Sequence, residues 1–369
     1  MAYMPMRANI GQPLIIGFDG TEMSTRLASL LTRVQPAGVI LFARNITGVE
    51  QTYRLLRECQ KFVTTPLFTC VDLEGGTVDR FRNVLGPAPS AAAVFSTGNR
   101  QVFRKHGRIL GANCRALGFN VDFAPALDLA FDASRSVMSS RVVSSDPKRV
   151  VFYAREFLRG LNESGVLGCG KHFPGLGEAN LDTHHDLPRV NKTLKKLWEQ
   201  DLVPYRTMRR ELPFVMVSHA AFRAVTKEET PASLSKKWIT GILRKKIGYR
   251  GLICSDDLEM GGVLAAAPIE QAVIGHIRAG GDLGLICHQE ELIRRAHEAM
   301  IREAERDRRF AQRVEESAQR VMAFKKRWLR GWRPAPVPTT AKVEKLTRQL
   351  WEFGEEIRLD ALERQERAL

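Results

Sequence analysis

The sequence predicts an α/β protein, a single-domain (β/α)8 barrel of the TIM type with a C-terminal helical extension. Eight short apolar runs, rich in Val, Ile, Leu and Phe, alternate with segments long enough for crossover helices. Each run is continuously apolar rather than alternating, which is typical of parallel strands buried on both faces. Eight strand–helix units within about 290 residues match this barrel in number and in size.

The expected strands and helices follow this rhythm along the chain. We expect strands at residues 14–19, 38–43, 67–72, 120–125, 165–171, 214–219, 251–256 and 282–287. We expect crossover helices at residues 52–62, 103–117, 150–164 and 194–210. An open doubly wound sheet also alternates strands and helices. It is disfavoured because residues 17–20 (GFDG), after the first strand, lack the glycine spacing of a dinucleotide-binding loop.

The composition changes after the eighth expected strand. Residues 290–330 are charged and helical in pattern, residues 331–340 are Pro-rich, and residues 342–369 are again amphipathic. We therefore expect a barrel domain at 1–330 and a Pro-rich linker with a helical tail at 331–369. The apolar side chains expected to anchor this tail are Leu346, Leu350, Trp351, Phe353 and Ile357.

The chain is basic, but its charge pattern does not indicate nucleic-acid binding. It has 369 residues, with 56 Lys and Arg against 41 Asp and Glu, and a net charge of +15. The basic residues are interleaved with Glu along helical stretches, and no nucleic-acid-binding motif accompanies them. Hydrophobic residues make up 44% of the chain, which excludes a disordered protein.

The cysteines and the N-terminus favour a cytoplasmic protein. The six cysteines are scattered without a C-x-x-C pair, and several lie in apolar runs, where cysteine behaves as a small buried hydrophobe. No apolar run reaches the roughly 18–20 residues of a membrane span. Residues 1–11 lack the pattern of a signal peptide, so we expect neither export nor a membrane span.

Ionisable residues gather at the C-terminal ends of the expected strands. The third strand ends at Asp72, the fifth at Lys171 and His172, and the seventh at Asp256. In a (β/α)8 barrel these ends converge on the face that carries active sites. Placing such charges at one end of a core has a desolvation cost, so their concentration there indicates an enzyme. His219, which ends the sixth strand, fits either a hydrogen-bonded core residue or a substrate contact.

Residues 171–188 carry the most specific pattern. They read KHFPGLG, then four residues, then Asp182-Thr183-His184, with Leu187-Pro188 after. This segment resembles the signature of glycoside hydrolase family 3, in particular its β-N-acetylglucosaminidase branch. Residues 71–82 (VDLEGGTVDRFR), 118–129 (GFNVDFAPALDL) and 251–260 (GLICSDDLEM) are similar to further blocks of the same family, in the same order.

The resemblance implies a role for each matching residue. Asp256 corresponds to the catalytic nucleophile and His184 to the acid/base, with Asp182 orienting the imidazole. The residues that correspond to sugar-binding positions are Asp72, Arg80, Arg141, Lys171 and His172. Because Asp256, His184 and Asp182 fill these roles, we expect no metal and no cofactor. Leu176, Thr77 and Thr183 depart from the family pattern, where His, Arg and Ser are usual.

The implied function is retaining exo-hydrolysis of terminal non-reducing β-linked N-acetylglucosamine, from a glycoside or a muropeptide in peptidoglycan recycling. The alternatives are a β-glucosidase or a broad β-hexosaminidase of the same family. A metal-dependent barrel hydrolase could use Asp256, His172, His184, His219 and Asp182 as ligands. It is disfavoured because the first strand lacks the H-x-H pair common at such sites. An inert sugar-binding barrel is disfavoured because all three catalytic groups are present. The oligomeric state stays open.

Overall fold

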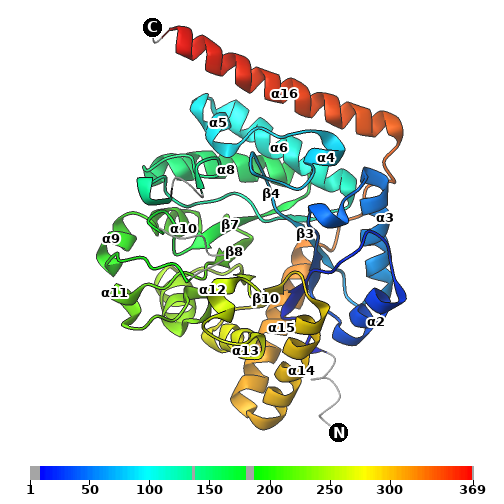
Figure 1. Cartoon of the computed structure of the whole chain (residues 1–369), viewed down its shortest axis with the longest axis vertical. Helices are drawn as coiled ribbons and strands as arrows, with labels where there is room; N and C mark the ends of the chain where they lie inside the picture. The colour runs from blue at the N-terminus through cyan, green and yellow to red at the C-terminus, as the bar shows by residue number, and fades with distance from the viewer. Residues whose placement is uncertain (1–8, 135–137, 180–186, 368–369) are drawn as a thin grey trace.

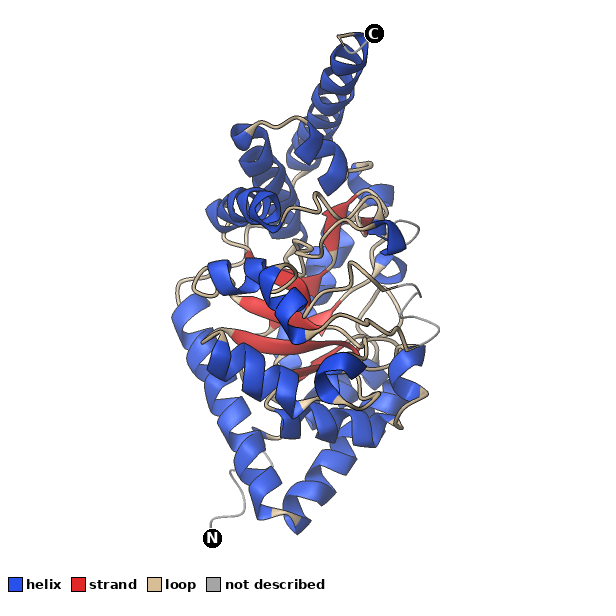
Figure 2. Ribbon diagram, turned by 90° about the vertical axis from the view of Figure 1, so that its left-hand side faces the viewer, coloured by secondary structure: helices blue, strands red, loops and turns tan. Residues whose placement is uncertain are grey.

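The barrel predicted from the sequence is present and closed. The structure, a computed structural model, describes residues 9–134, 138–179 and 187–367 (Figure 1). The barrel strands are β1 (Leu14–Ile16), β2 (Gly38–Ile40), β3 (Phe68–Val71), β6 (Val121–Asp122), β7 (Leu167–Phe173), β8 (Phe214–Val217), β9 (Leu252–Asp257) and β10 (Leu283–Ile286). They pair in parallel in the order β1-β10-β9-β8-β7-β6-β3-β2, and helices surround them (Figure 2).

Each of these strands lies on one of the eight apolar runs, so the fold class is confirmed. Only β7 and β9 continue beyond the predicted runs, to Phe173 and to Asp257. Because β1 pairs with both β2 and β10, the sheet closes on itself, and an open doubly wound sheet is excluded.

The period of two along each strand decides which side chains face the inside of the barrel. Alternate residues of β3, β7 and β9 share one inner apolar cluster, while residues between them, such as Val71 and Ile253, pack outward against the helices. The inner side chains of these three strands are Phe68, Cys70, Leu167, Cys169, Leu252 and Cys254. The next positions with the same parity are Asp72, Lys171 and Asp256, which therefore reach the C-terminal mouth of the barrel.

Helices cover the outside of the barrel, and they include helices in the segments predicted at 52–62, 103–117, 150–164 and 194–210. They are α2 (Thr25–Val34), α3 (Val49–Cys59), α6 (Arg100–Leu117), α8 (Pro147–Glu163), α9 (Leu194–Glu199), α10 (Val203–Met208), a π-helix (Lys237–Lys246), α13 (Ile269–Ala279) and α14 (Glu290–Arg306). Side-chain caps define several starts: Asn99 accepts from a backbone N–H of α6, and Asp146 does the same for α8. The segment 194–210 forms two helices, α9 and α10, rather than one.

A small hairpin follows β3 directly and was not predicted. Its strands are β4 (Leu73–Gly75) and β5 (Val78–Asp79), which pair antiparallel. Gly75 has φ of +81°, and a Cβ there would lie 2.1 Å from the carbonyl oxygen of Pro89. The close approach and the left-handed backbone both require glycine. The hairpin places Glu74 and Arg80 beside the barrel mouth.

The C-terminal segment folds as three helices. The charged stretch 290–330 divides at Asp307, whose side chain caps α15 (Arg308–Trp328). Helix α15 covers the N-terminal end of the barrel, because its Val321 joins the inner cluster and its Phe324 ring lies 6.1 Å from that of Phe68. An extended segment then leads to α16 (Thr340–Glu366), which lies across α4 (Arg82–Leu85), α5 (Ala91–Ser96) and α6 (Figure 1).

The anchors of α16 are partly as predicted. Leu346, Leu350, Phe353 and Ile357 are buried, whereas Trp351 is 66% exposed. The prediction for Trp351 was wrong because it directly follows Leu350, and adjacent residues of a helix point in directions about 100° apart.

The cysteines lie in the apolar interior, where the sequence places several of them. All six cysteines are buried and unpaired. Within the described ranges, no helix is long and apolar enough to cross a membrane.

Candidate active site

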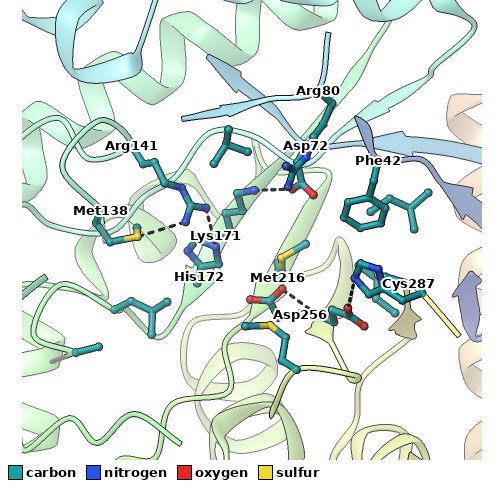
Figure 3. Close-up of a pocket in the computed structure, with 18 of the residues that line it drawn as sticks. Phe42, Asp72, Arg80, Met138, Arg141, Lys171, His172, Met216, Asp256 and Cys287 are labelled. Carbon is teal, nitrogen blue, oxygen red and sulfur yellow. Dashed lines mark hydrogen bonds and ion pairs between the residues drawn. The ribbon is translucent and has the colours of Figure 1, made fainter. Parts of the chain in front are cut away.

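One pocket at the C-terminal mouth of the barrel gathers six of the eight predicted site residues (Figure 3). They are Asp72, Arg80, Arg141, Lys171, His172 and Asp256. The two remaining residues, Asp182 and His184, lie outside the described residues. The structure therefore brings the predicted nucleophile and the predicted sugar-binding residues together, and it leaves the predicted acid/base pair undescribed.

Three carboxylate–cation pairs organise one wall of the pocket. Lys171 Nζ lies 2.7 Å from Asp72 Oδ1 and 2.7 Å from Glu74 Oε1. Arg141 donates to both oxygens of Glu74, over 2.7 and 2.9 Å. This bidentate geometry holds the planar guanidinium in one orientation. Both cations are thus fixed before any ligand arrives.

The electrostatics of this wall keep Glu74, Arg141 and Lys171 charged. Burial alone raises the pKa of Glu74, but the nearby charges of Arg141 and Lys171 outweigh it and lower that pKa below its ordinary value. Burial lowers the pKa of Lys171, yet Asp72 and Glu74 raise it above the ordinary value of a lysine. Such a network offers charged donors and acceptors of fixed direction, which suits the hydroxyl groups of a sugar.

Glu74 is a functional residue to which the sequence assigned no role. It does not line the pocket, and only 3% of its surface is exposed. Its role is to position Arg141 and Lys171, which do line it. The available signal was its place between Asp72 and Gly75, two residues from a predicted sugar-binding carboxylate.

Asp128 fixes His172 and the loop that follows. It accepts from the imidazole Nδ1 over 2.7 Å, from the backbone N–H of His172 over 3.1 Å and from that of Leu176 over 2.7 Å. On its other side, the His172 Nε2 lies 3.2 Å from Arg141 Nη2. The register of β7 against β8 shifts between Gly170 and Phe173, and both Lys171 and His172 line the pocket.

Asp256 lies at the end of β9 with its carboxylate in the pocket (Figure 3). Its Oδ1 accepts from the backbone N–H of Asp257 over 2.9 Å. Burial raises the pKa of Asp256, but His172, His219, this N–H and Lys171 together lower it below the ordinary value. The side chain is therefore an ionised carboxylate at neutral pH, as a nucleophile requires.

His219 is a buried structural residue and does not line the pocket. Its Nε2 donates to the carbonyl oxygen of Asp257 over 2.8 Å, and its Nδ1 lies 2.7 Å from Ser233 Oγ. Burial lowers the pKa of His219, which favours the neutral ring. Of the two interpretations left open by the sequence, the structure supports the hydrogen-bonded core residue.

The rim of the pocket contains residues that the sequence did not indicate. The guanidinium of Arg80 lies 5.4 Å from the ring centroid of Phe42, and the His288 ring lies 5.0 Å from the same ring. Phe42, Arg80 and His288 lie on the loops that follow β2, β5 and β10, respectively. No sequence motif marks Phe42 or His288. Leu176, one of the departures from the family pattern, also lines the pocket.

Several groups of the alternative metal site have other partners. Across the ranges that the structure describes, no three His, Cys, Asp or Glu side chains are grouped as metal ligands. His172 contacts Asp128 and Arg141, and His219 contacts Ser233 and Asp257.

Comparison with known proteins gives consistent results over most of the chain. Residues 6–324 match the family model described as the glycosyl hydrolase family 3 N terminal domain. A β-hexosaminidase from Idiomarina loihiensis is 34% identical over 279 residues, which cover 74% of this chain and 83% of that protein.

Solved structures agree with this match. A family 3 β-N-acetylglucosaminidase from Paenibacillus sp. str. FPU-7 superposes with a TM-score of 0.89 at 30% identity, covering 95% of this chain and 68% of that one. NagZ from Neisseria gonorrhoeae, solved in complex with zinc ion, superposes with a TM-score of 0.72 at 26% identity, covering 92% and 97%. Barrel, pocket and relatives together define the class of protein, a glycoside hydrolase. The chain belongs to glycoside hydrolase family 3.

Proposed function

We propose that the chain is a retaining exo-glycosidase that removes terminal non-reducing β-linked N-acetylglucosamine. The observation that carries this proposal is the ionised Asp256 at the mouth of the barrel, opposite the fixed wall of Asp72, Lys171 and Arg141. Two of the relatives described above are named a β-hexosaminidase and a β-N-acetylglucosaminidase, which supports this substrate class. We further propose that muropeptides in the cytoplasm are the physiological substrates.

The first chemical step forms a glycosyl-enzyme. The Asp256 carboxylate attacks the anomeric carbon while His184 gives its proton to the glycosidic oxygen, and the aglycone leaves as an alcohol. In the second step the neutral His184 takes a proton from water. The resulting hydroxide attacks the anomeric carbon, and the Asp256 carboxylate is released. Two inversions give net retention.

The acid/base assignment is an exception to the usual pair of carboxylates. Its support is the match of residues 171–188 to the family signature and the ordinary chemistry of imidazole, whose pKa near neutrality suits a group that gives and takes a proton. In this proposal Asp182 accepts the other imidazole N–H and stabilises the imidazolium.

The pocket wall supplies sugar binding. Asp72 accepts hydrogen bonds from hydroxyl groups of the terminal sugar, while Lys171, Arg141 and Arg80 donate to them. Leu176 places an apolar side chain where the family usually has histidine, so contacts beyond the terminal sugar differ here.

A panel of aryl β-glycosides that differ at C2 tests the proposal. We expect hydrolysis of the p-nitrophenyl N-acetylglucosaminide, with the β-anomer released first in a proton NMR time course. Faster turnover of the glucoside would favour the β-glucosidase, and equal turnover of the N-acetylgalactosaminide would favour a broad β-hexosaminidase. Initial release of the α-anomer would overturn the retaining mechanism.

The role of His184 is tested by the dependence on the leaving group. His184→Ala removes proton donation, which is worth roughly 10²–10⁴-fold. A dinitrophenyl glycoside needs little protonation, so it should still form the glycosyl-enzyme and give a burst, with azide partly restoring turnover. Asp182→Asn should have an intermediate effect. Equal losses with natural and activated substrates, without azide rescue, would exclude His184 as the acid/base.

The metal-dependent alternative needs its own experiment. We expect activity to survive dialysis against EDTA, because the proposed nucleophile and acid/base need no Lewis acid. Loss of activity with EDTA, and its recovery with Zn²⁺ or Mn²⁺, would favour the metal-dependent hydrolase.

A further inference from the structure

A second cavity lies at the opposite end of the barrel from the sugar pocket. It has a volume of about 840 Å³ and is lined by α3, by the segments that precede β3 and β6, and by the end of α15 with the chain that follows it. The lining includes Leu67 and Asn120, just before β3 and β6, whereas the residues of the sugar pocket lie at the C-terminal ends of strands. The two cavities are therefore separated by the core of the barrel.

The charge of this cavity has one sign. No aspartate or glutamate lines it, but five basic residues do: Arg57, Lys325, Lys326, Arg330 and Arg333. Some arginines elsewhere on the surface face carboxylates, as in Arg33 with Glu298 at 2.9 Å and Arg155 with Glu211 at 2.7 Å. Within the described ranges, none of the five basic residues of the cavity forms such an ion pair.

Two further groups in the lining lack the expected partners. Lys325 is buried, and its Nζ has only neutral acceptors, the Gln12 Oε1 at 3.1 Å and the Thr65 Oγ1 at 3.2 Å. The indole N–H of Trp332 is buried with no acceptor among the described residues. Four of the five basic residues are exposed and Lys325 is buried. A concavity lined by charges of one sign concentrates ions of the opposite sign, so this arrangement favours an anionic ligand.

We propose that this basic cavity binds a compact polyanion of the phosphate class, at a site separate from the sugar pocket. Guanidinium groups present a planar fork that matches phosphate oxygens, and three of the five basic residues are arginines. A single carboxylate would compensate only one of five charges, whereas a pyrophosphate group compensates several from a small volume.

The buried lysine contributes to the same site. Burial lowers the pKa of Lys325 to about 7, so part of the population is neutral in the absence of a ligand. An anion beside it favours the charged form. The other titratable side chain that acts on it is Cys70, and burial raises the pKa of that thiol well above its ordinary value, which keeps it uncharged.

Calorimetric titration of the full chain with pyrophosphate tests the proposal. We expect saturable binding that weakens as salt concentration rises. The triple variant Arg57→Gln/Lys326→Gln/Arg330→Gln should bind at least about tenfold more weakly, because three charge-assisted contacts are lost. The matched control is the triple variant Lys195→Gln/Lys245→Gln/Arg250→Gln, which also removes three positive charges. Its three positions are exposed, lie outside the cavity and form no ion pair among the described residues. This control should bind pyrophosphate as tightly as the unaltered chain does.

Further arms identify the source of the phosphate and the location of the site. Equal affinity for pyrophosphate and ADP supports recognition of the phosphate oxygens alone, and tighter binding of ADP supports an organic phosphate. Saturating N-acetylglucosamine should not displace pyrophosphate, because the two sites are separate. Both triple variants should unfold at the same temperature as the unaltered chain. If the first triple variant does not fold, the single variant Arg57→Gln replaces it. Absence of pyrophosphate binding, an equal loss in both triple variants, or binding of a single-stranded oligonucleotide that pyrophosphate does not displace would overturn the proposal.

Discussion

Two lysines at opposite ends of the barrel show how environment sets the state of the same side chain. Lys171 and Lys325 are both 2% exposed. At the mouth, Asp72 and Glu74 lie against Lys171 and raise its pKa above the ordinary value, although burial opposes this. At the N-terminal end, Lys325 has two neutral acceptors, and burial lowers its pKa to about 7.

The difference between the two lysines matches the ligands that we propose for the two ends. At the mouth the protein's own carboxylates compensate the cations, so the wall carries little net charge and suits a neutral sugar. At the other end no aspartate or glutamate is among the described residues that line the cavity, so the cavity suits an anion. One barrel thus carries a neutral polar site and a cationic one, and the substitutions below test whether the two ends differ in this way.

The largest expected effect is at the mouth, from Asp256→Asn. Removing the proposed nucleophile should lower kcat by about 10⁴–10⁶-fold for every glycoside, because both steps of the proposed mechanism pass through this carboxylate. The matched control is Asp257→Asn, whose side chain accepts from the backbone N–H of Glu259 over 3.0 Å. Steady-state kinetics with an aryl N-acetylglucosaminide measure both. A larger loss of kcat for Asp257→Asn than for Asp256→Asn would indicate that Asp257, and not Asp256, is the nucleophile.

The second effect concerns the stability of the wall. Glu74→Gln leaves Arg141 without its paired carboxylate and Lys171 with Asp72 alone, which should lower the free energy of unfolding by about 3–5 kcal/mol. The control is Glu50→Gln, whose partner Arg54 is exposed, where the loss should stay below about 1 kcal/mol. Urea titration measures both. Equal losses would mean that the wall is not held by the Glu74 charge.

The pH dependence of the Glu74 contribution has a defined sign. The folded-state pKa of Glu74 is lowered from the ordinary 4.5, so its stabilisation is complete above that value and is lost as the pH falls below it. The difference in unfolding free energy between the unaltered chain and Glu74→Gln should therefore shrink on acidification below about pH 4.5.

The strands and the mouth could be predicted because they depend on local pattern. Each strand is one apolar run, and the period of two carries Asp72, Lys171 and Asp256 to the inner side of the barrel end. Parallel strands bring such ends together whatever their separation in sequence.

The partners of these residues could not be predicted because they depend on contacts across the fold. Glu74 and Arg141 are 67 positions apart, and nothing local to either residue specifies their pairing. The basic cavity likewise joins Arg57 of α3 to Arg333 after α15. His219 ends an expected strand, as the predicted site residues do, and only its contacts with Ser233 and Asp257 distinguish it from them.

Lys325→Met tests the other end of the comparison. The folded-state pKa of about 7 lies below the ordinary 10.5, so the unfolded chain binds more protons between these values and stability rises with pH there. The slope should be at most about 1.4 kcal/mol per pH unit. Lys325→Met should be more stable than the unaltered chain at pH 7, and its advantage should decrease by pH 9. The control is Lys326→Met, at the exposed neighbouring lysine, whose difference in stability from the unaltered chain should not depend on pH in this range. Urea titrations in phosphate-free buffer measure the free energy of unfolding of each chain. A difference between Lys325→Met and the unaltered chain that stays constant from pH 7 to pH 9 would contradict the prediction.

The smallest expected effect comes from Thr77→Val, which removes a surface contact at the mouth and leaves its buried charges in place. Thr77 Oγ1 lies 2.7 Å from Ser140 Oγ, which joins the β4–β5 turn to the residue before Arg141. Thr77 is exposed, so Thr77→Val should lower the free energy of unfolding by only about 0.5–1.5 kcal/mol. Because Arg141 stays paired with Glu74, we expect kcat to be unchanged and KM to rise a few-fold as the turn loosens. Ser140→Ala should have the same effect, and the double variant should add nothing to either, since both changes remove one hydrogen bond. Additive losses would show that the two hydroxyls act independently, and a loss as large as that of Glu74→Gln would show that the surface contact matters as much as the buried charge.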